Sequence, residues 1–213
     1  MIDVRTFTVG PVAENCYVAR LDQADRGVIF DPGDEPERII EAVEGLGISV
    51  DAILLTHCHF DHIGAVAPVA RSTVAPVYCP QIEVPVLADI MAYVPWPGFG
   101  PFESYEADHT IAGGEHLSIA GLELDVLFTP GHSPGHVTYA IPDQGAIFSG
   151  DVLFKGSVGR TDLPGGDWET LLGSIRGLVE GYPEETVVYP GHMGITTLGA
   201  ERATNPFLAE LAR

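Results

Sequence analysis

Lysine is nearly missing from this sequence: Lys155 is the only one, and arginines make up the rest of the ten basic residues. Aspartate and glutamate number 30, which leaves a formal net charge of −20 at pH 7. A surface of this charge repels phosphate backbones and anionic membrane faces. We therefore expect no nucleic-acid partner and no membrane partner.

Cysteine is also scarce, and long apolar runs are absent. The three cysteines, Cys16, Cys58 and Cys79, are odd in number and widely spaced, so they imply no disulfide framework. We expect Cys16 and Cys79 to be buried thiols. Apolar runs such as VIF and AILL are too short to cross a membrane. The start, MIDVRTFTVG, lacks the basic segment and apolar stretch of a secretory signal. These features together predict a cytoplasmic protein.

The pattern of strands and helices predicts an α/β fold in one domain over residues 1–213. Hydrophobic residues make up 46% of the chain, enough for a substantial core. Short strand patterns and amphipathic helix patterns alternate, and the series of strands followed by helix, strand and helix occurs twice. Two mixed sheets that face each other, with helices outside, are the simplest arrangement. Residues 93–110 are rich in proline, glycine and aromatics, and form either a lid beside an active site or an irregular surface insertion.

The stretch THCHFDH, residues 56–62, crowds His57, His59, Asp61 and His62 behind an apolar strand pattern. Strand side chains alternate between faces, so His57 and His59 should point one way and Cys58 the other. Imidazoles and carboxylates are ligands that zinc, iron and manganese accept. This cluster therefore predicts a metal site at the end of a strand.

Three further candidates follow apolar strand patterns and glycine turns. They are His132 in FTPGHSPGH, Asp151 in FSGD and His192 in VYPGH. A residue in this setting projects from a rigid sheet edge, where a site needs accurate placement.

These motifs, in this order, resemble the metallo-β-lactamase superfamily over nearly the whole chain. The resemblance implies an αββα sandwich of two mixed β-sheets flanked by helices. It also implies two divalent metal ions, with zinc the first expectation and iron or manganese as alternatives. One ion would take His57, His59 and His132, the second would take Asp61, His62 and His192, and Asp151 would bridge them. Asp61 would also orient the hydroxide that bridges the metals.

Three more stretches, GDVLFKGSVGRTDLPGGD, FDPGD and ERATNPFL, resemble the glyoxalase II-like group of hydroxyacylglutathione hydrolases. The chain resembles the short form of that group, which lacks the C-terminal helical region. The resemblance implies a metal-dependent hydrolase acting on a small-molecule thioester such as S-lactoylglutathione. It places Arg160, Asn205 and Phe207 at the substrate, although capping and packing are the alternative roles for Asn205 and Phe207.

Other activities remain open at this point. A persulfide dioxygenase of the same superfamily would hold one iron with His57, His132 and Asp151, and a lactonase or β-lactamase would use the same site. A non-catalytic metal-binding protein and an RNA-processing enzyme are further alternatives, and the net charge argues against the RNA enzyme. The oligomeric state is not predicted.

Two further residues, His136 and Asp31, each have two possible interpretations. His136 either contacts the substrate or a ligand, or is hydrogen-bonded inside the fold, and we favour the second. Asp31 either orients a metal-bound imidazole or caps a turn. His109 and His116 are expected at the surface.

Overall fold

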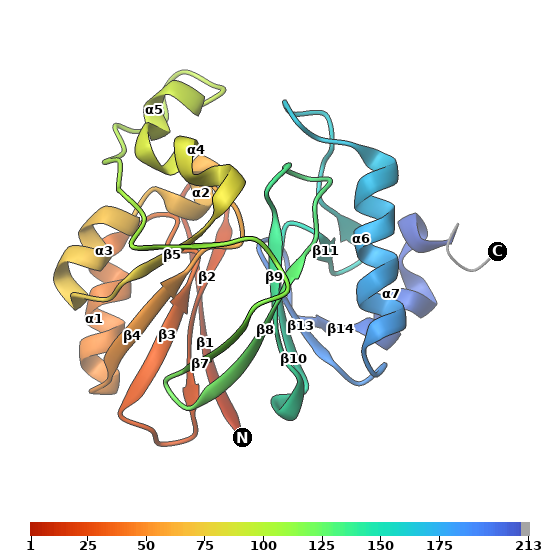
Figure 1. The fold of residues 1–213 in the computed structure, drawn as a ribbon, viewed down its shortest axis with the longest axis horizontal. Coiled ribbons are helices and arrows are strands. Elements are labelled where there is room, and N and C mark those ends of the chain that lie inside the picture. The colour runs from red at the N-terminus through yellow and green to blue at the C-terminus, as the bar shows by residue number, and fades with distance from the viewer. Residues whose placement is uncertain (210–213) are drawn as a thin grey trace.

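Two six-stranded sheets face each other in the computed structural model, which describes residues 1–209 (Figure 1). Helices α1 (Pro36–Leu46) and α3 (Val66–Thr73) cover the first sheet, and helices α6 (Trp168–Gly181) and α7 (Leu198–Thr204) cover the second. The expected αββα sandwich is confirmed. No helix among residues 1–209 has the length and apolar character needed to cross a membrane.

The first sheet contains the N-terminal strands in chain order. Its members are β1 (Ile2–Val9), β2 (Glu14–Leu21), β3 (Arg26–Phe30), β4 (Ser49–Leu54), β5 (Val77–Pro80) and β6 (His109–Ile111). The first three strands pair antiparallel, and the pairs from β3 to β6 are parallel. The sheet is therefore mixed.

The second sheet has the order β14-β13-β10-β9-β8-β7. Its members are β7 (His116–Ile119), β8 (Leu122–Phe128), β9 (Val137–Ile141), β10 (Ala146–Gly150), β13 (Val187–Pro190) and β14 (Thr196–Thr197). Only β10 and β13 pair parallel. A separate hairpin joins β11 (Leu153–Phe154) to β12 (Ser157–Val158).

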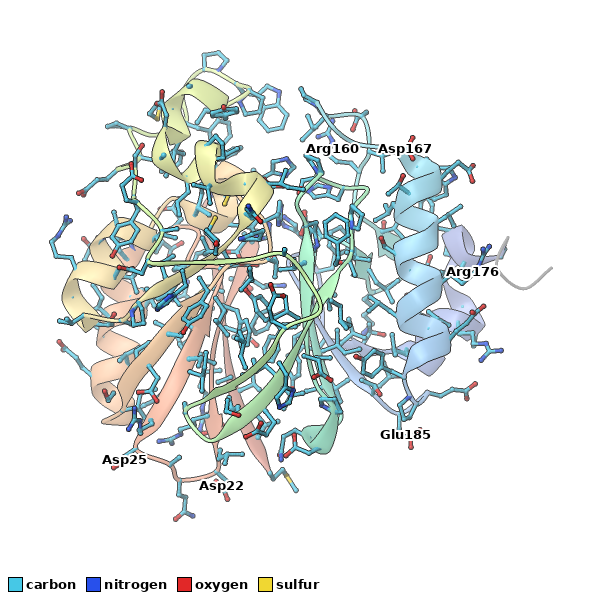
Figure 2. All side chains as sticks on the ribbon, viewed as in Figure 1. Asp22, Asp25, Arg160, Asp167, Arg176 and Glu185 are labelled. Carbon is cyan, nitrogen blue, oxygen red and sulfur yellow. The ribbon has the colours of Figure 1, made fainter. Side chains whose placement is uncertain are left out.

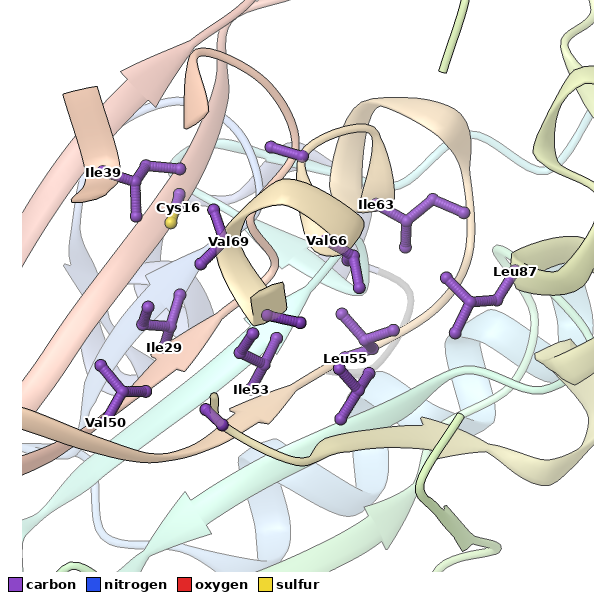
Figure 3. Packing of buried hydrophobic residues seen from close by; sticks show 14 of the residues in the cluster. Cys16, Ile29, Ile39, Val50, Ile53, Leu55, Ile63, Val66, Val69 and Leu87 are labelled. Carbon is purple, nitrogen blue, oxygen red and sulfur yellow. The ribbon is translucent and has the colours of Figure 1, made fainter. Parts of the chain in front are cut away.

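The alternation of side chains along the strands builds three apolar layers. In β3, Ile29 packs toward the helices, while Val28 and Phe30 face the second sheet. Figure 3 shows Ile29 and Ile53 together with Val69 of α3 in the helix-facing layer. Between the sheets, Phe30 stacks on Phe148 of β10 with ring centroids 3.8 Å apart.

Two local patterns in the sequence predict helices that the structure divides differently. The stretch HIGAVAPVARS, residues 62–72, predicts one short helix, but the structure has two, α2 (Phe60–Ile63) and α3, separated at Gly64 and Ala65. The stretch QIEVPVLADIMAY, residues 81–93, predicts a helix interrupted by Pro85. In the structure Pro85 lies in the first turn of α4 (Val84–Ala88), where its missing N–H costs nothing, and α5 (Ile90–Tyr93) follows. His109 and His116 are exposed as expected, but they lie in strands.

The remaining elements are single 3₁₀ turns: η1 (Gln81–Glu83), η2 (Pro142–Gln144) and η3 (Pro206–Leu208).

The carboxyl ends of five strands meet at one edge of the sandwich. Strands β3 and β4 are parallel neighbours, and β8, β10 and β13 share one direction in the second sheet. Hydrogen bonds join the two edges, from Val137 N to Thr56 O at 2.8 Å and from Asn15 N to Gly191 O at 2.7 Å. Loops after these strands therefore face one another.

Candidate metal centre

All seven predicted metal ligands come together at this edge. The loop after β4 and helix α2 carry His57, His59, Asp61 and His62, although β4 ends at Leu54 and does not run into the cluster. The second sheet supplies the others, one from each of the loops after β8, β10 and β13: His132, Asp151 and His192.

Three imidazoles form a first group of donors. His59 Nδ1 lies 3.1 Å from His57 Nε2 and 2.8 Å from His132 Nε2. Donors of one tetrahedral zinc, each about 2.1 Å from the metal, lie about 3.4 Å apart. The three nitrogens are thus close enough to share one ion.

Asp61, His62 and His192 form a second group. Asp61 Oδ2 lies 3.3 Å from His192 Nε2 and 3.9 Å from His62 Nε2. Asp151 joins the two groups, because its oxygens lie 3.3 Å from His62 Nε2, 3.4 Å from His132 Nε2 and 3.5 Å from His192 Nε2. This is the position that a bridging ligand requires.

Hydrogen bonds behind the rings turn the correct nitrogens toward the centre. His62 Nδ1 donates to Asp31 Oδ2 at 3.1 Å, and His57 Nδ1 donates to Thr56 Oγ1 at 3.1 Å. Thr56 Oγ1 in turn donates to Asp31 Oδ2 at 2.6 Å. Asp31 therefore sets the orientation of two rings. Of the two interpretations of Asp31, these contacts agree with the one in which it orients a ligand imidazole.

Main-chain carbonyls hold the rings of His132 and His192 from behind. His132 Nδ1 donates to the carbonyl of Arg160 at 2.7 Å, and His192 Nδ1 lies 3.3 Å from the carbonyl of Ala13. The Nε2 atoms of both rings are left to face Asp151.

Two buried atoms at the junction of the groups indicate that the donors fit metal ions. His62 Nε2 and Asp151 Oδ1 are buried from solvent, and neither has a hydrogen-bond partner among the described residues. When His62 is neutral and its Nδ1 proton points to Asp31, Nε2 is an acceptor and faces the acceptor Asp151 Oδ1 across 3.3 Å. A cation between them removes this repulsion.

The proton affinities of the two groups differ in a way that follows from their surroundings. Burial lowers the pKa of His59 to about 4, and burial with neighbouring imidazoles lowers the pKa of His57. Burial opposes protonation of His62 and His192 as well, but nearby carboxylates outweigh it and raise both pKa values. Burial also opposes ionisation of Asp151, yet the facing histidines lower its pKa. The second group thus attracts positive charge strongly.

Two glycines in the motifs allow the close packing around these ligands. A Cβ on Gly191 would overlap Asp151 Oδ1 and lie 2.7 Å from the His62 ring, and a Cβ on Gly33 would overlap the carbonyl of Asp61. The FDPGD and YPGH motifs therefore need glycine for lack of space.

Glu14, at the start of β2, is a site residue that the sequence did not reveal. Its side chain is 1% exposed, neither carboxylate oxygen has a hydrogen-bond partner among the described residues, and Oε1 lies 3.8 Å from His62 Nδ1. Burial raises the pKa of this carboxyl well above its usual range. The available signal was an acidic residue at the start of a strand whose centre, residues 16–19, is apolar.

His136 supports the site from inside the fold. It is fully buried, its Nε2 accepts the main-chain N–H of Asp151 at 3.0 Å, and its Nδ1 lies 3.0 Å from Thr129 Oγ1. The favoured interpretation of this residue agrees with these contacts. Cys58 points away from the ligands, with its Sγ 3.5 Å from Cys79 Sγ in the core.

The three residues expected at the substrate lie in different settings. Arg160 is half-exposed, and its guanidinium donates to Asp162 at 2.6 and 2.7 Å. Asn205 is 3% exposed and uses its amide inside the fold, accepting from Phe207 N at 3.0 Å and donating to Ser157 O at 2.9 Å.

These contacts give Asn205 the capping role that was the alternative to a place at the substrate, and they occupy its polar atoms. Phe207 packs against Trp168 with ring centroids 6.3 Å apart, which is the packing alternative.

The chain is similar in sequence to a known family and to several of its members. The family model described as the Metallo-beta-lactamase superfamily matches residues 9–192. The chain is 44% identical over 209 residues to the probable metallo-hydrolase YqgX of Bacillus subtilis (strain 168), covering 96% of each chain. It is 32% identical to the hydroxyacylglutathione hydrolase GloC of Haemophilus influenzae, covering 97% of this chain and 98% of that protein.

Two proteins with crystal structures share a higher sequence identity with this chain than GloC does. BLEG-1 B3 metallo-beta-lactamase is 41% identical with a TM-score of 0.91, covering 97% of this chain and 100% of that one. TTHA1623 in a di-iron-bound form is also 41% identical, with a TM-score of 0.85 and coverage of 96% and 100%.

Proposed function

The chain belongs to the metallo-beta-lactamase superfamily, and we propose that it is a metal-dependent hydrolase of thioesters such as S-lactoylglutathione. The observation that carries the proposal is the facing pair His62 Nε2 and Asp151 Oδ1, buried without partners where two groups of donors meet. The similarity to GloC supports the thioester, and the di-iron form of TTHA1623 supports two ions.

The donor set names the residues that would hold the ions. His57, His59 and His132 would bind one ion, and Asp61, His62 and His192 would bind the other. Asp151 would be shared. When bound, such ions lower the pKa of a coordinated water from 15.7 to about 7 and polarise a carbonyl. Zinc is the first candidate, and iron or manganese would accept the same ligands.

The protein's own groups would then align the reactants. The Asp61 side chain is 15% exposed and lies at the solvent-reachable side of the cluster, where it can accept a hydrogen bond from the attacking water and orient it. His57 and His62 are held rigidly by Thr56 and Asp31, so the centre needs little rearrangement.

A thioester suits this arrangement because its leaving group needs no proton. A thiol has a pKa of about 8.5, so the thiolate departs as the anion. An amide nitrogen must be protonated as it leaves, which requires an additional acid.

The test is thiol release by protein stripped of metal and reloaded with zinc, iron or manganese. We expect S-lactoylglutathione to release free thiol only after reloading, and His57→Gln to abolish release. His109→Gln, an exposed histidine on β6, is the matched control and should retain wild-type rates. Thiol release that is equal with and without metal would contradict the proposal.

A second candidate reaction is hydrolysis of a β-lactam, favoured by the similarity to BLEG-1. Loss of a chromogenic cephalosporin, faster than thiol release by the same reloaded protein, would favour it. Oxygen uptake with glutathione persulfide tests the dioxygenase alternative, and ring opening of a lactone tests the lactonase.

A further inference from the structure

Residues 94–108, which connect α5 to β6, are fixed to the first half of the molecule through their C-terminal part. Tyr105 N donates to the carbonyl of Leu87 at 3.0 Å, and Ser104 Oγ accepts from Ile90 N at 3.1 Å. Both acceptor and donor lie in or next to α4 and α5, so the base of this segment is anchored and its tip projects beyond these helices.

The tip places Trp96 beside the metal-binding loop. Its indole meets Phe60 edge-on, with ring centroids 6.1 Å apart, and Phe60 directly precedes Asp61. Phe60 is buried, and Phe99 and Phe102 of the same segment cover its ring. Trp96 itself stays 40% exposed, so part of its surface is free for another molecule.

Trp96 also contacts the second half of the molecule. The guanidinium of Arg160, which is labelled in the upper half of Figure 2, lies over the indole with Cζ 5.8 Å from the ring centroid. The carbonyl of the same arginine holds His132. Trp96 thus contacts both a neighbour of Asp61 and the residue whose carbonyl orients His132.

We propose that Trp96 determines substrate specificity by forming a wall against which the thiol arm of the thioester lies. The proposal rests on the proposed thioester hydrolysis and adds a specificity-determining residue to it. Planar amides and methylenes of a thiol arm pack well on an indole face. Asp162 occupies two of the five N–H donors of Arg160, so the others remain for the substrate contact that the resemblance implies for Arg160.

Fluorescence gives a test of binding that does not depend on turnover. The chain has two tryptophans, and Trp168→Phe leaves Trp96 as the only one. We expect titration of metal-loaded Trp168→Phe protein with S-methylglutathione to change its emission, and Trp96→Phe protein to show no change. An unchanged spectrum in Trp168→Phe protein that hydrolyses S-lactoylglutathione would overturn the proposed role of Trp96 but not the proposed thioester hydrolysis. A spectral change in protein that hydrolyses no thioester would support the contact of Trp96 with the thiol arm and would contradict the proposed reaction.

Kinetics with long and short thioesters separates a substrate contact from a structural role. Trp96→Ala should raise KM for S-lactoylglutathione about 10-fold with kcat retained, because it removes binding that ground state and transition state share. It should leave the KM of a short thioester, S-acetyl-N-acetylcysteamine, unchanged, and Trp96→Phe should restore part of the loss.

Tyr93→Ala, which removes an exposed aromatic from the end of α5, is the control and should behave as wild type. An equal loss on both substrates would show that Trp96 only supports Phe60 and would overturn the proposal.

Discussion

Replacing Asp31 by asparagine tests whether this carboxylate holds the ligand rings in place. Asp31 accepts three hydrogen bonds, from Thr56 N at 2.7 Å, Thr56 Oγ1 at 2.6 Å and His62 Nδ1 at 3.1 Å. Asparagine keeps the shape but turns one acceptor oxygen into an NH₂ donor. If the NH₂ takes the place of Oδ1, Thr56 N loses its acceptor. If it takes the place of Oδ2, Thr56 Oγ1 and His62 Nδ1 both lose theirs, and the imidazole is free to rotate or change tautomer.

The expected size of the effect on zinc binding follows from the bond to His62 that is lost. A hydrogen bond to a charged group contributes about 1.5–3 kcal/mol. Substitution of a group that orients a metal-bound histidine weakens metal binding about 10–100-fold, and this range converts to about 1.4–2.8 kcal/mol. The two free-energy ranges agree, so we expect the zinc dissociation constant of Asp31→Asn to rise about 10–100-fold.

The measurement is competition for zinc between the stripped protein and a chromophoric chelator. Asp34→Asn is the matched control, because it makes the same change in the same loop while its carboxylate bonds only to Glu35 N, at 2.7 Å. Circular dichroism checks that both variants are folded. Equal zinc affinities in the two variants would refute the idea that Asp31 orients the ligands.

Other variants probe the bridge, the close packing and the surface. Asp151→Ala should lose most of the bound metal by elemental analysis, and two equivalents retained per chain would contradict the bridging assignment. Gly191→Ala should fold but bind less metal, because its Cβ overlaps Asp151 Oδ1. Gly177→Ala, in α6 with open space around it, should raise the free energy of unfolding by about 0.5–1 kcal/mol in urea melts. His116 has a pKa raised by hydrogen bonds to two carboxylates, so its stabilising effect is complete below pH 6.5 and is lost as pH rises through the raised value. The stability difference between wild type and His116→Gln should therefore be larger at pH 6 than at pH 9. A difference independent of pH would refute the idea that protonated His116 stabilises the fold.

The layers of the fold were predictable because apolar periodicity reports which face of a strand or helix is buried. Strands β2, β3 and β4 and helices α1 and α6 follow from such patterns. Short strands such as β6 and β14 carry too few residues for a period to emerge, and β6 is separated from its partner β5 by α4 and α5. The division between α2 and α3 was also hidden, because a break in a helix leaves the spacing of apolar residues nearly unchanged.

The candidate ligands were predictable, but much of their support was not. His57 and His62 stand in a dense motif, whereas His132 is held by the carbonyl of Arg160, which any residue type would supply. His136 acts on the main chain of Asp151 in the same way. Sequence patterns record side chains, so a contact made by the backbone leaves no trace in them. The contact of Trp96 with Arg160 joins segments more than sixty residues apart and was equally hidden.

The distribution of charge around His62 gives a physical reason for coupling metal binding to folding. Glu14, Asp31, Asp61 and Asp151 all lie within 4 Å of its ring nitrogens. Among the described residues, the ion pairs of these four carboxylates are made with histidines, and none is made with lysine or arginine. Buried carboxylates without a cationic partner destabilise a fold. A divalent ion supplies the missing positive charge only when the strand ends have assembled, so its binding energy adds to the stability of the folded chain.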